Sequence, residues 1–278
     1  MKRVILCADD YGQNRAVSRG ILALIRKKSL SATGCFANSP HFAEHGQWLQ
    51  THLGEIDVGL HFNLTEGQAL APIASVTRGL QLPSLSQLLL RSHLGSLSMQ
   101  AIKEELLRQI DRFQKVMGVL PNFIDGHQHV HQFPTIREAV LEVYQQQFRS
   151  SQIYIRSAAN ISNVGESGFK NWMIRHTGAV RLEHRLNTMN IPHNKSFGGI
   201  YSFAKPERYP QLFFSFLKGI GDQGLIMCHP GFESNDRRDP LINSRYHEYE
   251  YFSSERFKQH LAEAKVRLCS FREFLRHY

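Results

Sequence analysis

Two adjacent aspartates, Asp9 and Asp10, follow the first apolar run of the chain at residues 4–8. A short run of aliphatic and β-branched residues that ends in acidic residues and Tyr11-Gly12 is typical of a buried strand leading into a turn. Carboxylates are costly in a core unless they pair with a cation or bind a metal. Because active sites of α/β proteins lie at the carboxyl ends of strands, this pair indicates a functional site.

Histidines and further polar residues follow three later strand-like runs. They are His61, Asn63, Asp125, His127, His129, His131 and His229. In a parallel barrel the carboxyl ends of all strands meet at one rim, however far apart they are in sequence. Imidazole and carboxylate ligands suit a catalytic divalent ion, which keeps positions open for water and substrate. A lone histidine is more often structural, but this recurrence at four strand ends predicts a metal-dependent enzyme.

Strand-like and helical segments alternate along the chain. Strands are expected near residues 4–8, 32–37, 56–63, 122–126, 154–158, 225–228 and 266–269. Helices are expected near residues 14–28, 98–117, 172–189, 209–220 and 253–264, and a further helix is expected to begin at Pro134. This alternation predicts an α/β fold, a parallel barrel with helices outside, as a single domain over residues 1–278. Two segments, 64–97 and 233–251, are interpreted as irregular excursions at the rim, and Arg245 in the second suits sugar hydroxyls.

Composition narrows the class of protein. The hydrophobic fraction of 42% is enough for a large core, and no apolar run approaches the ~20 residues that span a bilayer. The first apolar run is interrupted by Asp9, so we expect neither a signal peptide nor a transmembrane protein. The cysteines lie in apolar stretches without a CxxC pair, which favours reduced core residues and a cytoplasmic location. They are Cys7, Cys35, Cys228 and Cys269.

The chain carries a formal net charge of +9. Its basic residues are spread out, with a modest enrichment at residues 170–195, and no nucleic-acid-binding motif accompanies them. This distribution favours a solvated basic surface over a nucleic-acid partner. The sequence leaves the oligomeric state open, a homo-oligomer included.

The motifs are recognisable when taken together. Residues 8–12 (ADDYG), 59–65 (GLHFNLT), 125–131 (DGHQHVH) and 229–231 (HPG) resemble the YdjC-like carbohydrate deacetylases, which include chitooligosaccharide and hopanoid-associated deacetylases. The resemblance runs in the same order along nearly the whole chain. It implies a distorted TIM-like (β/α) barrel of the glycoside hydrolase/deacetylase type. It also implies one divalent metal ion, Zn²⁺ or Mg²⁺, and hydrolysis of the acetamide of an N-acetylated sugar or glycoconjugate.

The family pattern also suggests roles for individual residues. It implies Asp10, His61 and His127 as metal ligands and Asp9 as the general base. Adjacent strand residues point to opposite sides, but both can reach one cavity where a strand ends in a turn. His229 is the best candidate for the general acid, because an imidazole with a near-neutral pKa can protonate a leaving amine.

The remaining candidates have open alternatives. In an extended chain His127, His129 and His131 share a face, whereas in a helix only His127 and His131 do. We take His127 as the ligand, His131 as the reserve and His129 as facing substrate or supporting the ligands. Asp125 either orients a ligand imidazole or caps a loop. Asn63 is expected to hydrogen-bond the substrate.

Three classes of function remain. The first is a metal-dependent N-deacetylase of amino sugars. The second is another metallohydrolase, such as a phosphoesterase, although a two-metal phosphoesterase needs more bridging carboxylates than the chain offers. The third is a non-catalytic carbohydrate-binding protein, which the intact set of candidate residues disfavours.

Overall fold

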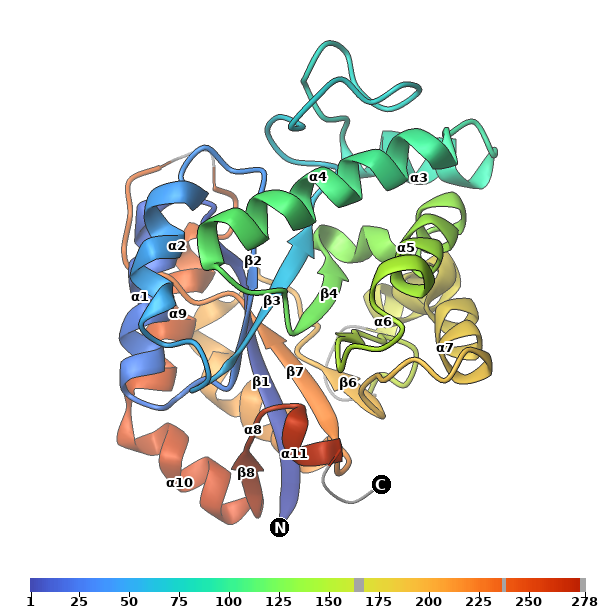
Figure 1. The fold of residues 1–278 in the computed structure, drawn as a ribbon. Coiled ribbons are helices and arrows are strands. Elements are labelled where there is room, and N and C mark those ends of the chain that lie inside the picture. Colours follow the sequence, from blue (N-terminus) through green and yellow to red (C-terminus); the bar gives the residue numbers. More distant parts are fainter. Residues whose placement is uncertain (163–167, 237–238, 276–278) are drawn as a thin grey trace.

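A single parallel sheet forms the centre of the protein in a computed structural model that describes residues 1–162, 168–236 and 239–275. Its strands are β1 (Lys2–Tyr11), β2 (Ala32–Cys35), β3 (Asp57–Phe62), β4 (Phe123–Gly126), β5 (Tyr154–Ile155), β6 (Ser196–Gly198), β7 (Gly224–Cys228) and β8 (Val266–Leu268). The strand order is β5-β4-β3-β2-β1-β7-β6, with β8 beside β1, and the pairings are parallel. The predicted parallel α/β fold is confirmed (Figure 1).

Isolated main-chain contacts continue the sheet between its two edge strands. The N–H of Phe197 in β6 donates to the carbonyl of Asn160, and the N–H of Ser162 donates back to the carbonyl of Phe197, both at 2.9 Å. These residues follow β5, so the chain curls toward a barrel that is regular on one side and irregular on the other. This geometry matches the distorted TIM-like barrel that the sequence predicted.

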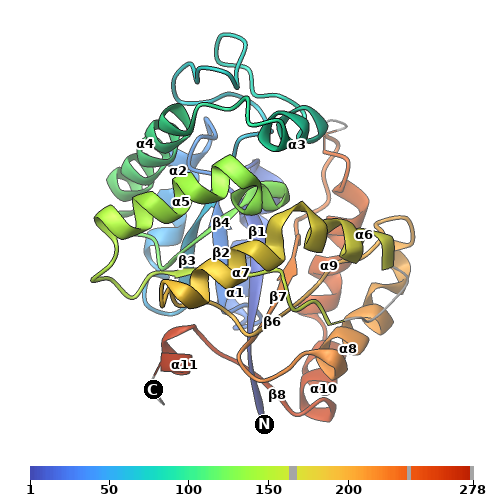
Figure 2. The same cartoon turned by 90° about the vertical axis from the view of Figure 1, so that its right-hand side faces the viewer.

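Helices cover the outside of the sheet (Figure 2). They are α1 (Arg15–Arg26), α2 (Phe42–Gln50), α3 (Leu85–His93), α4 (Met99–Met117), α5 (Pro134–Gln147), α6 (Gly168–Ile174), α7 (Val180–Thr188), α8 (Tyr209–Gly219), α9 (Ile242–Ser253), α10 (Glu255–Glu263) and α11 (Arg272–Leu275). Their ends follow local chemistry: Ser98 accepts the Ala101 N–H at the start of α4, and left-handed Gly118 ends that helix.

The middle of β1 is apolar until the strand reaches the rim. Residues 4–8 of β1 are completely buried, which is expected of a parallel strand covered on both faces. Strand β8 pairs with the amino end of β1 at residues 2–4, whereas β2 and β7 flank its carboxyl half on opposite sides. Asp9 and Asp10 therefore stand on the most constrained strand of the fold.

Two expectations about irregular segments need correction. The excursion at residues 64–97 contains helix α3, which a capping box at Ser84 starts. The supposed rim loop at residues 233–251 is largely helix α9, whose buried positions include Arg245 and Glu248. Three of the charged side chains of this segment, Asp239, Arg245 and Glu248, are buried and meet other polar groups.

A third difference lies between residues 172 and 189, where one helix was expected. The structure has α6, a π-helical turn at Arg175–Ala179 and α7. Gly178 breaks the helix with φ +132°, and a Cβ there would lie 2.0 Å from the carbonyl oxygen of Gln132. The close approach of this neighbouring chain explains why glycine occupies the position.

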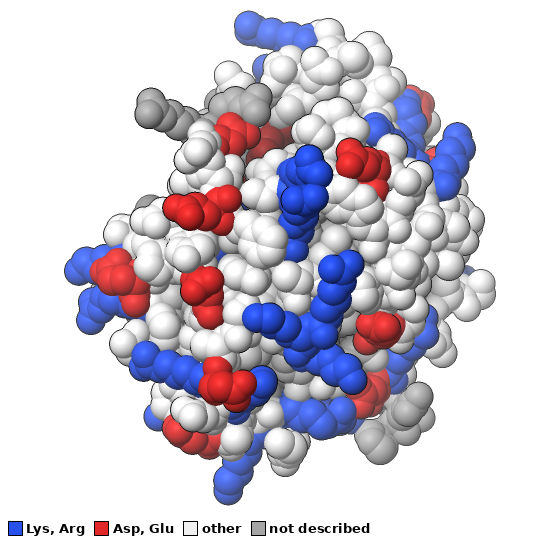
Figure 3. All heavy atoms as spheres, turned by 90° about the vertical axis from the view of Figure 1, so that its left-hand side faces the viewer, with Lys and Arg blue, Asp and Glu red and all other residues white. Residues whose placement is uncertain are grey.

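The surface and the cysteines agree with the composition. On the face that carries α1 and α10, basic and acidic side chains lie next to each other, without a continuous basic patch (Figure 3). All four cysteines are free and buried. In the described part of the chain, the helices are too short or too polar to cross a bilayer.

Candidate metal centre and active site

The end of β1 directs two neighbouring carboxylates into one cavity. The pairing of β1 with β2 becomes irregular between Ala8 and Tyr11. Asp10 has φ +71°, a left-handed conformation that non-glycine residues adopt mainly at functional sites. This local turn removes the alternation of a regular strand, so both Asp9 and Asp10 line the cavity while each is almost fully buried.

The cavity has a volume of about 310 Å³ and combines a polar floor with an apolar wall. Carboxylates and imidazoles from the strand ends form the floor. The wall consists of apolar and aromatic side chains, among them Met173, Ile200, Tyr201, Phe203 and Leu241. This combination suits a small organic group whose polar atoms face the floor.

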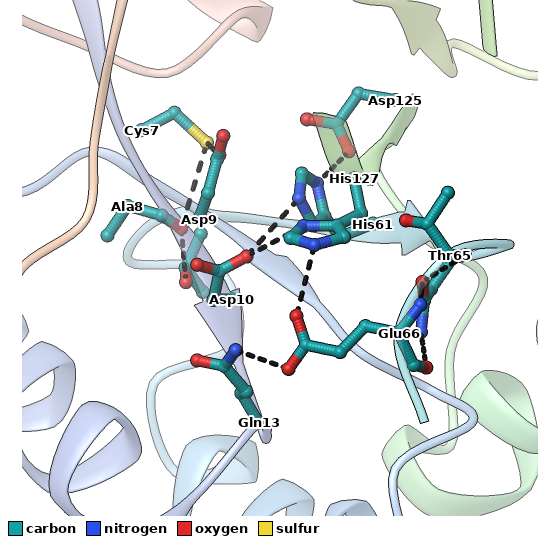
Figure 4. A network of polar contacts seen from close by, with 12 residues as sticks. Cys7, Ala8, Asp9, Asp10, Gln13, His61, Thr65, Glu66, Asp125 and His127 are labelled. Atoms are coloured by element: carbon teal, nitrogen blue, oxygen red, sulfur yellow. Dashed lines mark hydrogen bonds and ion pairs between the residues drawn. The ribbon is translucent and has the colours of Figure 1, made fainter. Parts of the chain in front are cut away.

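Three side chains converge on one point of the floor (Figure 4). Around Asp10 Oδ1 lie His127 Nδ1 at 3.3 Å and His61 Nε2 at 3.5 Å. One donor atom from each of the three residues lies within 4.8 Å of the others. Asp10 Oδ1 is buried and accepts no hydrogen bond from the described residues. One oxygen and two nitrogens in this arrangement fit a divalent cation.

A second carboxylate stands behind each imidazole. Asp125 Oδ1 lies 2.7 Å from His61 Nδ1, and Glu66 Oε2 lies 3.2 Å from His127 Nε2. Such outer carboxylates fix the ring orientation and the tautomer of metal-binding histidines. Burial lowers the pKa of His127, but the nearby carboxylates of Asp10 and Glu66 outweigh it and raise that pKa to about 9.

Asp9 is held by Arg156, which sequence reasoning missed. The guanidinium of Arg156 donates to both oxygens of Asp9 at 2.6 and 2.7 Å, and it lies 2.6 Å from Asp125 Oδ2. Burial raises the pKa of Asp9, but the Arg156 charge outweighs burial and lowers it below its usual range. The sequence predicted a strand over residues 154–158 with Arg156 inside it, whereas β5 ends at Ile155 and Arg156 follows it, so the strand-end argument did not point to this residue.

Asp10 has a cationic partner of its own in α9. Arg245 Nη2 lies 2.8 Å from Asp10 Oδ2, and Arg245 Nε lies 2.7 Å from Asp239 Oδ2. Burial raises the pKa of Asp10, but Arg245 and His127 lower it well below its ordinary value. Arg245 therefore supports a candidate metal ligand in addition to lining the cavity.

His229 lies just beyond β7 and lines the same cavity. Its main-chain N–H donates to Glu248 Oε2 at 2.6 Å, and its ring packs edge-on against Phe203. Within the described residues, its Nδ1 has no hydrogen-bond partner. Burial lowers the pKa of His229, although the nearby Asp9 and Asp10 carboxylates oppose that shift.

The structure separates the remaining candidates. Gln128 and His129 both have positive φ, and His129 lines the cavity while His131 turns away and lies 3.0 Å from the carbonyl of Arg156. Asn63 uses its amide inside the adjoining loop: Oδ1 accepts two main-chain N–H groups, and Nδ2 donates to Glu66 O and to a neighbouring amide. It has no hydrogen-bonding group left for a substrate, so its expected role does not fit this geometry.

Comparisons with known proteins identify the family of this chain. The family described as YdjC-like protein matches residues 3–263. The chain is 30% identical to a chitooligosaccharide deacetylase of Proteus mirabilis (strain HI4320), with 98% of each chain covered. It is 27% identical to a carbohydrate deacetylase of Geobacillus stearothermophilus, with 97% of each covered.

A solved structure extends the similarity to the fold. A putative cellobiose-phosphate cleavage protein from Enterococcus faecalis V583 superposes with a TM-score of 0.75 at 20% identity, with 98% of each chain covered. The sequence match and the shared fold both extend over nearly the whole chain. This chain belongs to the YdjC-like protein family.

Proposed function

We propose that this protein is a metal-dependent hydrolase that removes the N-acetyl group from an N-acetylated amino sugar, in an oligosaccharide or a glycoconjugate, and releases acetate. The observation that carries the proposal is the convergence of Asp10, His61 and His127 in a cavity that Asp9 and His229 also line. Relatives named as carbohydrate and chitooligosaccharide deacetylases support it. The buried free cysteines support a cytoplasmic location.

In this proposal Asp10, His61 and His127 hold the ion. When bound, a divalent cation polarises the acetyl carbonyl and makes a water molecule more acidic. Asp125 and Glu66 keep the two imidazoles in place through their outer nitrogens. The apolar wall of the cavity contacts the acetyl methyl group and the sugar ring.

Two residues move protons in this proposal. Asp9 stays ionised beside Arg156, so it can accept a proton from the attacking water as the carbon–oxygen bond forms. His229, in its protonated form, donates a proton to the nitrogen as the amide bond breaks, and the free amine leaves. Arg156 fixes both oxygens of Asp9 and thereby sets its orientation toward the water.

The structure also bears on the phosphoesterase alternative. Asp9, His61 and Asp125 form a second group of potential metal ligands. However, the guanidinium of Arg156 contacts both Asp9 and Asp125. Because this cation already neutralises the second group, the site supports one metal ion, whereas a two-metal phosphoesterase requires two.

The test is acetate release from a panel of N-acetylated sugars and glycolipids, with and without a chelator. We expect release from at least one substrate, loss of release after chelation and recovery when a divalent metal is added back. Release of phosphate from phosphoesters, or no acetate from any substrate with metal-loaded, folded protein, would contradict the proposal.

A further inference from the structure

A buried carboxylate on α9 contacts the main chain beside the site. Glu248 has 0% exposure. Its Oε2 accepts the main-chain N–H of His229 at 2.6 Å, and its Oε1 accepts the hydroxyl of Tyr201 at 2.5 Å. Burying a carboxyl group is costly unless hydrogen bonds compensate. The function proposed above gives Glu248 no role, although it meets the segment that carries the general acid.

Helix α9 accepts hydrogen bonds from the main chain of residues 229–231 at two points. The N–H of Gly231 donates to the carbonyl of Arg245 at 3.0 Å, while the N–H of His229 donates to Glu248. Arg245 and Glu248 are three residues apart and thus share one face of the helix. From that face, Arg245 also reaches Asp10. One helix therefore contacts both a candidate metal ligand and the main chain of His229, which line the same cavity.

We propose that Glu248 is a positioning residue for the proton-donation step: by holding the main-chain N–H of His229, it aims the imidazole at the leaving amine. The proposal rests on the function proposed above. Glu248 does not touch Asp9 or the three candidate metal ligands in the contacts of the described residues, so attack by water does not depend on it. A displacement of about 1 Å at a catalytic group can cost ~10²-fold in rate.

Two substrates separate proton donation from the rest of the reaction. An acetylated amino sugar needs a proton on its leaving nitrogen, whereas 4-nitrophenyl acetate releases a stable phenolate without one. Both need the metal and the base. The ratio of their kcat values therefore reports on His229, and a general loss of structure or metal changes both together.

Two substitutions at residue 248 separate position from charge. Glu248→Gln keeps the length and an acceptor for the His229 N–H but removes the charge. Glu248→Asp keeps the charge but withdraws the acceptor by about 1.5 Å, one C–C bond. Tyr251→Phe is the matched control. Tyr251 also lies on α9, and the substitution removes the contact of its hydroxyl with Nδ1 of His260 on α10 without affecting the contact with His229.

We expect Glu248→Asp to lower kcat for the acetamide by about tenfold or more, while kcat for the ester stays within about twofold. Glu248→Gln should stay close to the wild type on both substrates. Tyr251→Phe should lower the melting temperature without changing the ratio. Metal content, from elemental analysis, should be equal in all variants.

Other outcomes overturn the proposal. Equal losses on both substrates in Glu248→Asp would show a merely structural role. No loss on either substrate would show that Glu248 has no role in proton donation. A loss in Glu248→Gln but not in Glu248→Asp would mean that charge matters and position does not. A wild-type protein that cleaves the ester but no acetamide refutes the proposed function itself, and that result is visible before any variant is made.

Discussion

The two parts of the site differ in how the fold supplies them. Asp10, His61 and His127 stand at or just beyond the ends of β1, β3 and β4, where each belongs to a short local motif. Arg156 and Arg245 come from an irregular edge of the barrel and from an outer helix, and each has no motif around it. The strand ends supply the groups that can bind an ion or move a proton, and the outer elements supply the cations that hold those groups.

This comparison predicts two kinds of response to mutation. Loss of a strand-end group should remove a step of the reaction completely. Loss of an arginine that holds one of these groups should leave the reacting groups present but less well aligned. The predictions below follow that order, beginning with the largest effect.

His127→Ala should have the largest effect. It leaves Asp10 and His61 as two ligands, which is fewer than the three that catalytic sites of this kind use. Loss of several kcal/mol of charge stabilisation corresponds to at least ~10³-fold in rate. Elemental analysis should find the metal missing, whereas His184→Ala, at an exposed histidine of α7, should retain it. A metal-loaded His127→Ala protein would show that the ligand set is different.

Asp9→Asn should stop turnover while metal remains bound. The amide has the shape of the carboxylate but cannot accept a proton, and a general base contributes ~10²–10⁴-fold. Acetate release and metal content should be measured on the same preparation. Retained turnover would refute the assignment of Asp9 as the base.

Arg156→Lys tests a residue that holds a reacting group, the Asp9 carboxylate, in place. Lysine keeps the charge, but it cannot bond both oxygens of Asp9 and also reach Asp125 as the guanidinium does. We expect acetate release to fall by about tenfold, less than for Asp9→Asn, and metal content to remain unchanged. Arg137→Lys is the control, since Arg137 is also buried but bonds to Gln132 and Glu138 away from the cavity. If Arg156→Lys lowered acetate release as much as Asp9→Asn, the distinction between reacting groups and the residues that hold them would be wrong.

The same difference between strand ends and outer elements explains which site residues could be predicted from the sequence. The apolar runs predicted the strands, and the strand ends predicted that Asp9, Asp10, His61, His127 and His229 would share one cavity. Those inferences are local, because a run and its final residue lie together in the chain. Arg245 was predicted only as a sugar-binding residue of a loop, since its contact with Asp10 depends on how α9 packs.

Asn63 shows a limit of another kind. Its spacing from His61 predicted that both side chains face one cavity, as they would on an extended strand. The strand ends at Phe62, however, and the next residues turn so that the Asn63 amide bonds to the main chain at Thr65 and Glu66. Asparagine and aspartate often stabilise turns in this way. The alternation rule failed because it was applied one residue beyond the end of the strand.

The smallest predicted effect concerns Glu66, whose side chain is 45% exposed and bridges His127 to Gln13. The pKa of His127 is raised to about 9 in the metal-free protein, so an ion that binds at pH 8 must displace a proton from it. Metal affinity should therefore weaken as the pH falls below about 9, and metal binding at pH 8 should release protons. In Glu66→Gln one of the two carboxylates that raise the pKa of His127 is lost, so fewer protons should be released when the metal binds.

Calorimetry in buffers of different ionisation enthalpy measures the number of protons released. Glu44→Gln, at an exposed position of α2, should not change this number. Equal proton release in Glu66→Gln and the wild type would show that Asp10 alone sets the protonation of His127, and that the outer carboxylate only orients the ring.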